Sequence, residues 1–236
     1  MTPDVPKRTK RATRYKNADV EAKAKKVELS PRTENQAKYL TALNGPNVVV
    51  AVGYSGTGKS YMAAVHAANL YLTKQIDKII LTRPNVAVGK DLGYLKGDLE
   101  EKFTPWLLPI LDTLSEVMGK GVVETAVKNG NIEFAPLAYM RGRSFQNAYI
   151  ILDEASNTSV AEIVMFLTRI GDNTKVVING DVLQQDIKGT SGLQVLLDIT
   201  KKYSIDLDLI EFQIEDIVRS PICKQFVIAF TKEGLL

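Results

Sequence analysis

Apolar positions along the chain gather in short continuous runs, and these runs are separated by longer segments with helical spacing. A strand covered on both faces of a sheet reads as a nearly unbroken apolar run, so each run predicts a buried strand. The predicted strands are Val48–Val52, Lys78–Arg83, Ile132–Ala135, Tyr149–Leu152, Lys175–Asn179 and Leu207–Phe212.

The segments between these strands predict helices. The first begins after Thr33, whose hydroxyl can cap it, with Gln36 three residues on as in a capping box. The others are a helix after Ser60, one from about Asp98 to Met118 broken by Pro105 and Pro109, one near Leu193 to Ile199, and one after Pro221. A further helix follows Asn157 and Thr158, either of which could cap it, and runs to about Ile170. Alternating strands and helices predict an α/β fold: a mostly parallel sheet flanked by helices, with ligands at the carboxyl ends of the strands.

The charge distribution divides the chain of 236 residues in two. Residues 1–27 hold nine Lys and Arg against three acids, whereas the remainder is mildly acidic. We therefore expect a basic, disordered arm over residues 1–28 and one globular domain over residues 29–236. Such an arm can contact the nucleic-acid backbone, or it can serve only solubility, and the sequence leaves both open.

Several classes of protein are disfavoured by composition. No apolar run approaches the roughly 18 residues of a membrane span, and the N-terminus lacks an apolar signal segment. The single cysteine, Cys223, cannot form an internal disulfide, which favours a cytoplasmic protein. His66 is the only histidine, which disfavours a histidine-based metal site or catalytic triad.

The most informative motif follows the first predicted strand. Gly53–Ser60 matches G-x-x-x-x-G-K-[ST], the phosphate-binding P-loop or Walker A motif. It joins a strand to a helix N-terminus, where backbone N–H groups and the helix dipole favour phosphate. Lys59 is expected to reach the β- and γ-phosphates, and Ser60 to ligate Mg²⁺. The candidate nucleotide-binding residues are Gly53, Ser55, Gly56, Thr57, Gly58, Lys59, Ser60 and Tyr61.

A second motif completes this chemistry. Ile150–Glu154 is an apolar strand that ends in two acids, which is the Walker B pattern. Asp153 is expected to hold Mg²⁺ together with Ser60, and Glu154 to orient or deprotonate the attacking water. The second acid favours ATP hydrolysis over the alternative of a small-molecule kinase, which would activate a substrate hydroxyl instead.

Two glutamines are further candidates. Gln184 follows the strand that ends at Asn179 and can sense the γ-phosphate, or it can belong to a polar turn. Gln36 precedes the first core strand and can pair bidentately with adenine, or it can only cap its helix.

Arginines that neutralise transition-state charge are a third group. The candidates are Arg143, Arg169 and Arg219, with Arg219 preferred because it lies late in the chain. Each can instead form a surface salt bridge.

The ordered set of motifs resembles the PhoH-like ATPases over about residues 30–231. The segments that carry the resemblance are Thr82–Val86, Leu92–Lys102, Ala135–Ser144, Leu152–Asn157, Phe166–Gly171, Gly180–Asp186 and Val218–Pro221. That family is similar to the first motor domain of superfamily 1 helicases. The resemblance implies a RecA-like sheet, hydrolysis of ATP with Mg²⁺, association with single-stranded RNA and assembly as a hexamer.

We therefore expect an RNA-associated MgATPase, with possible RNA helicase activity, in a homo-oligomeric ring. Because only one motor domain fits in the chain, a neighbouring subunit is expected to supply the missing arginine. The alternative is a nucleotide-regulated RNA-binding or assembly module with little hydrolysis.

Overall fold

The computed structural model describes residues 26–46, 48–84, 99–181 and 184–234. At its centre lies a six-stranded, all-parallel sheet in the order β3-β2-β4-β5-β1-β6. The strands are β1 (Val49–Gly53), β2 (Lys78–Thr82), β3 (Ile132–Phe134), β4 (Ala148–Leu152), β5 (Lys175–Gly180) and β6 (Asp208–Phe212). All six predicted strands are present, with ends that differ by at most one residue, and the predicted α/β class is confirmed.

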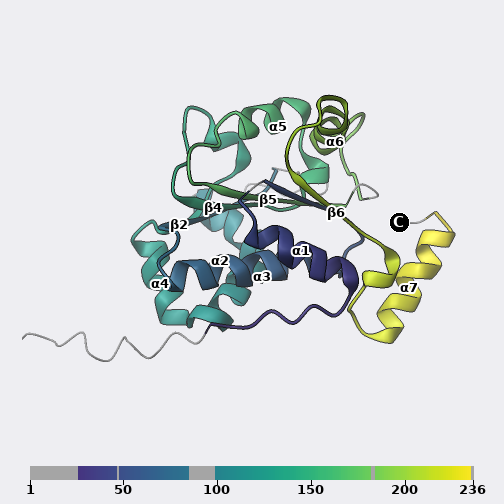
Figure 1. Ribbon diagram of the computed structural model, residues 1–236, viewed down its shortest axis with the longest axis horizontal. Coiled ribbons are helices and arrows are strands. Elements are labelled where there is room, and N and C mark those ends of the chain that lie inside the picture. Colours follow the sequence, from purple (N-terminus) through teal and green to yellow (C-terminus); the bar gives the residue numbers. More distant parts are fainter. Residues whose placement is uncertain (1–25, 47, 85–98, 182–183, 235–236) are drawn as a thin grey trace, which may run out of the picture.

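Helices cover both faces of the sheet (Figure 1). Below the sheet in that view lie α1 (Glu34–Asn44), α2 (Lys59–Leu72), α3 (Leu99–Met118) and α4 (Lys120–Lys128), and above it lie α5 (Val160–Leu167) and α6 (Gly192–Tyr203). Side chains alternate along each strand, so Val49, Ala51 and Val177 pack into one core, whereas Val50, Ile178 and Ile150 pack into the other. Burial on both faces is why these strands read as continuous apolar runs.

The strand order positions the site. After β1 the chain crosses to β2, and β4 and β5 later fill the space between them. The carboxyl ends of β1, β5 and β4 lie next to one another. Ala51 on β1 pairs with Asn179 on β5, and Ile178 on β5 pairs with Leu152 on β4. The loops after these strands therefore meet at one edge, where ligands bind in open parallel sheets.

The helix predictions need three corrections. Residues 99–118 form one helix in spite of Pro105 and Pro109, although a proline in a helix interior costs about 3 kcal/mol. Packing of α3 against α2 and α4 offsets this cost. The cap of α5 is Ser159, which forms a capping box with Glu162, rather than Asn157 or Thr158. Helix α4 was not predicted, because its apolar residues are few and glycines flank it.

Helix α7 (Pro221–Lys232) follows β6 and lies at the end of the molecule beyond α1 in Figure 1. It has no buried residue, and Ile222, Phe226 and Phe230 are exposed along it. Within the part of the chain that the structure describes, no helix combines the length and apolar character that a bilayer span requires.

Two glycines in the first turns of helices form a matched test of the packing. A Cβ on Gly192 would lie 2.5 Å from the Ser159 carbonyl oxygen and 2.9 Å from Ile163 Cβ, whereas a Cβ on Gly121 meets nothing within 4 Å. Gly192→Ala should lower the free energy of unfolding by about 1–3 kcal/mol through overpacking. Gly121→Ala should raise it by about 0.5–1 kcal/mol through helix propensity. Urea unfolding measures both, and equal effects would contradict the close approach of α6 to α5.

Candidate functional site

The loop between β1 and α2 wraps an open space at the carboxyl edge of the sheet. Gly56 and Gly58 adopt φ values of +78° and +90°, in the left-handed region that side chains disfavour. A Cβ at Gly56 would also lie 2.6 Å from Arg219 Nε. Backbone geometry therefore favours glycine at both positions, and at Gly56 the nearby Arg219 side chain also leaves no space for a Cβ.

Lys59 is the buried cation of this loop, with 9% of its surface exposed. Its ammonium donates hydrogen bonds to the carbonyl oxygens of Gly53 at 2.6 Å and Tyr54 at 2.7 Å. Burial lowers the pKa of Lys59, while the nearby carboxylates of Asp181, Asp153 and Glu154 act in the opposite direction. The site therefore holds a partly desolvated positive charge directly beneath the loop.

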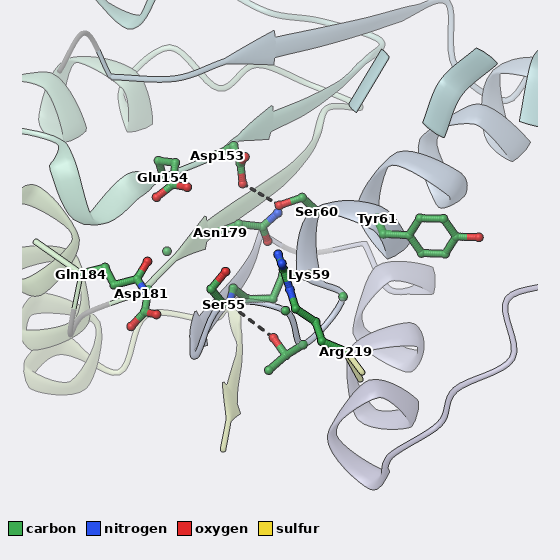
Figure 2. Close-up of a pocket in the computed structure, with 14 residues that line it drawn as sticks. Ser55, Lys59, Ser60, Tyr61, Asp153, Glu154, Asn179, Asp181, Gln184 and Arg219 are labelled. Carbon is green, nitrogen blue, oxygen red and sulfur yellow. Dashed lines mark hydrogen bonds between the residues drawn. The ribbon is translucent and has the colours of Figure 1, made fainter. Parts of the chain in front are cut away.

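Ser60 and Asp153 meet across the site. The Ser60 hydroxyl donates to Asp153 Oδ1 at 2.7 Å, which joins the start of α2 to the end of β4 (Figure 2). Among the described residues no cluster of three or more His, Cys, Asp or Glu side chains could hold a metal ion. A hydroxyl and one carboxylate suit Mg²⁺, which keeps several waters and takes further oxygens from substrate phosphates.

Glu154 follows in the same loop. Its backbone has φ of +54°, an uncommon conformation for a residue with a side chain and one that recurs at functional sites. Burial, and secondarily the Asp153 carboxylate, raise the pKa of Glu154, whereas Arg83 and Lys59 oppose the shift. Arg83, at the end of β2, approaches Glu154 Oε1 at 3.6 Å. A carboxylate whose pKa is raised is better matched to accepting a proton near neutral pH.

These groups share one pocket of about 220 Å³. Of the predicted residues, Ser55 to Tyr61, Asp153, Glu154, Gln184 and Arg219 line it, together with Asn179, Gly180 and Asp181. Figure 2 shows the charged and amide side chains gathered around one space, with the Tyr61 ring extending away from them. Gly53 lies outside the lining, but its carbonyl oxygen anchors Lys59.

Gln36 lies beneath the loop instead of in the pocket lining. Its Nε2 donates to the Thr57 carbonyl oxygen at 2.8 Å, and its Oε1 accepts from the Arg32 backbone N–H at 2.7 Å. The side chain is 4% exposed. Thr33 is the N-cap of α1, as predicted, because its hydroxyl accepts from the Gln36 backbone N–H at 3.2 Å. The capping box is not completed, since the Gln36 side chain bonds the backbone of Arg32 and not that of Thr33. The observed role is to tie α1 to the P-loop.

The three candidate arginines are separated. Arg143 forms a bidentate ion pair with Glu133 on β3, and its guanidinium lies 5.3 Å from the centre of the Phe145 ring. Arg169 precedes β5, and its carbonyl oxygen accepts from Phe145 N–H before β4, which places its backbone at the opposite edge of the sheet from the P-loop. Neither lines its own chain's pocket, so either would have to act from a neighbouring subunit.

Arg219, in contrast, lines the pocket of its own chain. The Val218 backbone N–H donates to the Gly56 carbonyl oxygen at 3.0 Å, which fixes the preceding residue against the P-loop. An arginine is thus already present at the pocket of its own chain, whereas the arginine expected from a neighbouring subunit stays a prediction.

The pocket fits a nucleoside triphosphate with Mg²⁺ on three observations. The glycine loop leaves no room for a Cβ at Gly56, Lys59 presents a buried ammonium, and the amide nitrogen of Asn179 is buried without a partner among the described residues. The buried ammonium and the buried amide both suit an anionic ligand that presents oxygens.

Comparison with known proteins agrees with this geometry. The sequence matches the family described as "PhoH-like protein" over residues 28–231. The chain belongs to the PhoH-like protein family. It is 43% identical over 219 residues to a PhoH-like protein of Bacillus subtilis, covering 92% of this chain and 68% of that protein. It is 40% identical over 206 residues to Protein PhoH of Escherichia coli K12, covering 85% of this chain and 57% of that protein.

Among solved structures, the Pif1 helicase of Candida albicans is similar with 15% identity and a TM-score of 0.45, covering 88% of this chain and 44% of that one. The resemblance drawn from the sequence motifs is confirmed at the level of the PhoH-like family of P-loop NTPases. The chain spans 57–68% of the length of the bacterial relatives named above, so it corresponds to one part of those proteins.

The polar side chains of this PhoH-like chain that were not singled out from sequence are Asn179 and Asp181, which line the pocket, and Arg83, which pairs with Glu154. All three stand at or just beyond the carboxyl end of a predicted strand. A polar residue at such a position is a sequence signal that these residues share with Asp153 and Glu154.

The contacts of Gln36 change what its removal should do. Because its amide bonds the P-loop backbone and not a base, Gln36→Ala should loosen the loop and weaken ATP and GTP binding by similar factors. Equilibrium titration with both nucleotides measures this. A loss of affinity for ATP alone would instead support recognition of adenine by Gln36. Loss of that bidentate pairing would weaken ATP binding by about 1–3 kcal/mol.

Proposed function

We propose that the chain hydrolyses MgATP to ADP and phosphate. The observation that carries the proposal is the 2.7 Å contact between Ser60 and Asp153, in a pocket that also contains Lys59 and Glu154. One edge of the sheet therefore holds the hydroxyl and the lysine of the Walker A motif, the aspartate of the Walker B motif and a second acid. Membership of the PhoH-like family of P-loop NTPases supports the same chemistry.

Each group has a role in this proposal. Loop N–H groups and the Lys59 ammonium bind the phosphates, and Lys59 exchanges its two carbonyl partners for phosphate oxygens. Ser60 and Asp153 would hold Mg²⁺, which would supply positive charge against the charge that develops on the phosphates. Glu154 orients the attacking water and accepts its proton, while Arg83 holds the Glu154 carboxylate from the side. Gln184 and Arg219 face the same space and can contact the terminal phosphate.

Substitutions of Lys59 and Glu154 should separate binding from chemistry. Lys59→Ala should abolish detectable MgATP binding, because it removes the buried cation. Glu154→Gln should bind MgATP normally and lower kcat by about 10²–10⁴-fold, since only water activation is lost. Nucleotide titration and phosphate-release assays measure the two effects.

Lys120→Ala is the matched control, because this lysine side chain is 84% exposed and remote from the pocket. It should bind and hydrolyse ATP as the parent does. Parental turnover in Glu154→Gln would remove Glu154 as the catalytic carboxylate, and absence of turnover in the parent would favour a nucleotide-regulated binding module.

We further propose that the basic arm contacts single-stranded RNA. Residues 1–25 lie outside the described residues and hold eight Lys and Arg against three acids. Val27 exchanges two backbone hydrogen bonds with the Asn69 amide on α2, so a deletion should stop at residue 25. Loss of residues 1–25 should weaken RNA binding and flatten its salt dependence, with basal ATPase retained. Filter binding across a salt series measures how steeply RNA affinity falls with salt concentration. An unchanged salt dependence would show that the arm does not contact the RNA backbone.

Assembly into a ring, with a hexamer as the expected size, is the remaining part of the proposal. Arg143 and Arg169 could serve an active site only across such an assembly, and exposed apolar side chains on α7 offer contact area. Sedimentation velocity with and without MgATP should show a closed oligomer. A monomer that hydrolyses ATP at its full rate would exclude the ring and leave Arg219 as the arginine of the site.

A further inference from the structure

A second cavity lies at the amino edge of the sheet, away from the nucleotide pocket. Its volume is about 490 Å³, and the loops that lead into β1, β2 and β5 line it together with the C-terminal halves of α1 and α2. A smaller cavity of about 280 Å³ shares four of its lining residues, namely Asn44, His66, Leu70 and Gln75. Ligand pockets measure about 300–1,000 Å³, so the larger cavity has room for a small molecule.

Lys175 is the cation of this larger cavity and the first residue of β5. Its ammonium donates hydrogen bonds to the carbonyl oxygens of Ala42 at 2.9 Å and Gly45 at 2.7 Å. An ammonium carries three N–H donors, so one donor remains without a hydrogen-bond partner among the described residues. Burial lowers the pKa of Lys175 to about 8, and the Asp208 carboxylate acts in the opposite direction. The cavity therefore presents a partly desolvated ammonium that can still donate one hydrogen bond.

His66 lines both cavities and is 7% exposed. Burial, followed by the positive charges of Lys175 and Lys26, lowers the pKa of His66 to about 4, so the ring is uncharged at neutral pH. Its nitrogens Nδ1 and Nε2 lie 3.2 Å from the Tyr149 hydroxyl and 3.4 Å from Asn44 Oδ1, respectively. An uncharged imidazole has one donor and one acceptor, and these two partners satisfy both. His66 therefore adds no charge to the cavity.

The remaining lining decides which ligand fits. Lys175 is the one charged side chain among the described residues that line the larger cavity. Hydrogen-bonding side chains come from Asn44, Gln75, Asn173 and Thr174, and an apolar wall comes from Leu43, Leu70 and Ile76. The ammonium disfavours a cation, and a wholly apolar ligand would leave the polar groups unpaired. The lining suits an anion that also carries apolar surface.

We propose that this cavity binds a small organic anion, whose phosphate or carboxylate oxygens accept a hydrogen bond from Lys175 and whose body lies against the apolar wall. The site is distinct from the nucleotide pocket, because Lys175 begins β5 whereas the P-loop follows the carboxyl end of β1, which runs parallel to β5. The two sites share one support, since α2 begins at Lys59 and also carries His66. The proposal does not depend on hydrolysis of ATP.

His66 gives a direct readout of binding, because it is the only histidine of the chain. In untagged protein its Cε1 proton gives a single NMR signal. Adenosine monophosphate, which carries a phosphate, and citrate, which carries carboxylates, are titrated separately at neutral pH. At least one of them should shift the signal saturably, with a dissociation constant of about 1 mM or tighter. The probe that binds identifies the anionic group, and absence of a saturable shift with both would overturn the proposal.

Lys175→Met removes the charge and keeps a long side chain. It should weaken the probe that binds by about tenfold or more, as expected for loss of a hydrogen bond between charged groups. Lys78→Met is the matched control, because Lys78 is the first residue of β2 and lines neither cavity. It should bind the probe as the parent does. Parental affinity in a folded Lys175→Met protein would overturn the assignment.

Gln75 carries the test if Lys175→Met does not fold. Its side chain is exposed, lines both cavities and donates only to the Thr73 hydroxyl among the described residues. Gln75→Glu should weaken the probe about threefold and Gln75→Lys should strengthen it about threefold, because the added charges act on the anion with opposite sign. Thermal unfolding verifies that each variant is folded. Affinities that change in the same direction, or not at all, would contradict an anion site.

Binding of the probe at the P-loop is the competing explanation for a shift, because α2 joins that loop to His66. Lys59→Ala removes the cation of the nucleotide pocket and should leave the shift of the His66 signal unchanged. Loss of the shift in Lys59→Ala, with Lys175→Met unaffected, would assign the anion to the P-loop and overturn the second site. Absence of ATP hydrolysis by the parent would contradict only the proposed function.

Discussion

The buried ammonium of Lys59 is the constraint on which the rest of the site depends. A cation with 9% exposure must be compensated, and here two loop carbonyls bond it while Asp181, Asp153 and Glu154 surround it with negative charge. The loop carbonyls can serve only because Gly56 and Gly58 allow the loop to curl over the side chain. A phosphate oxygen can replace these carbonyl oxygens with little loss of free energy, because it accepts the same hydrogen bonds and carries a full negative charge. Compensation of one charge thus explains both the loop shape and its ligand class.

The sheet order turns this local arrangement into a site. Insertion of β4 and β5 between β1 and β2 brings Asp153, Glu154 and Asn179 to the P-loop, although they are about a hundred residues away in the chain. Helix α1 then fixes the loop from below through Gln36 and fixes Asn179 through Tyr39. The residues that line the pocket are therefore supported by a second layer of residues, and much of that layer comes from the short helix α1.

Much of this architecture could be predicted from sequence, because strands buried on both faces and a glycine loop before a helix have strong local patterns. The Walker residues followed from the same logic. The side-chain partners that the sequence left open depend on tertiary context. Whether Gln36 faces a base or a backbone carbonyl depends on the path of the P-loop, and the ion pair of Arg143 depends on Glu133 in a neighbouring strand. Asn179 resembled an ordinary strand end, since only the folded structure shows that one half of its amide is bonded and the other is not. The predicted break at Pro105 and Pro109 was wrong, because the packing of α3 against α2 and α4 outweighs the low helix propensity of proline.

We infer that the pocket recognises phosphate before it recognises a base. Competition against MgATP by two fragments of the nucleotide tests it most directly: inorganic triphosphate with Mg²⁺, and adenosine. The account predicts that triphosphate displaces ATP from the purified chain and that adenosine at the same concentration does not. Displacement by adenosine, with triphosphate ineffective, would contradict a site organised around the Lys59 ammonium.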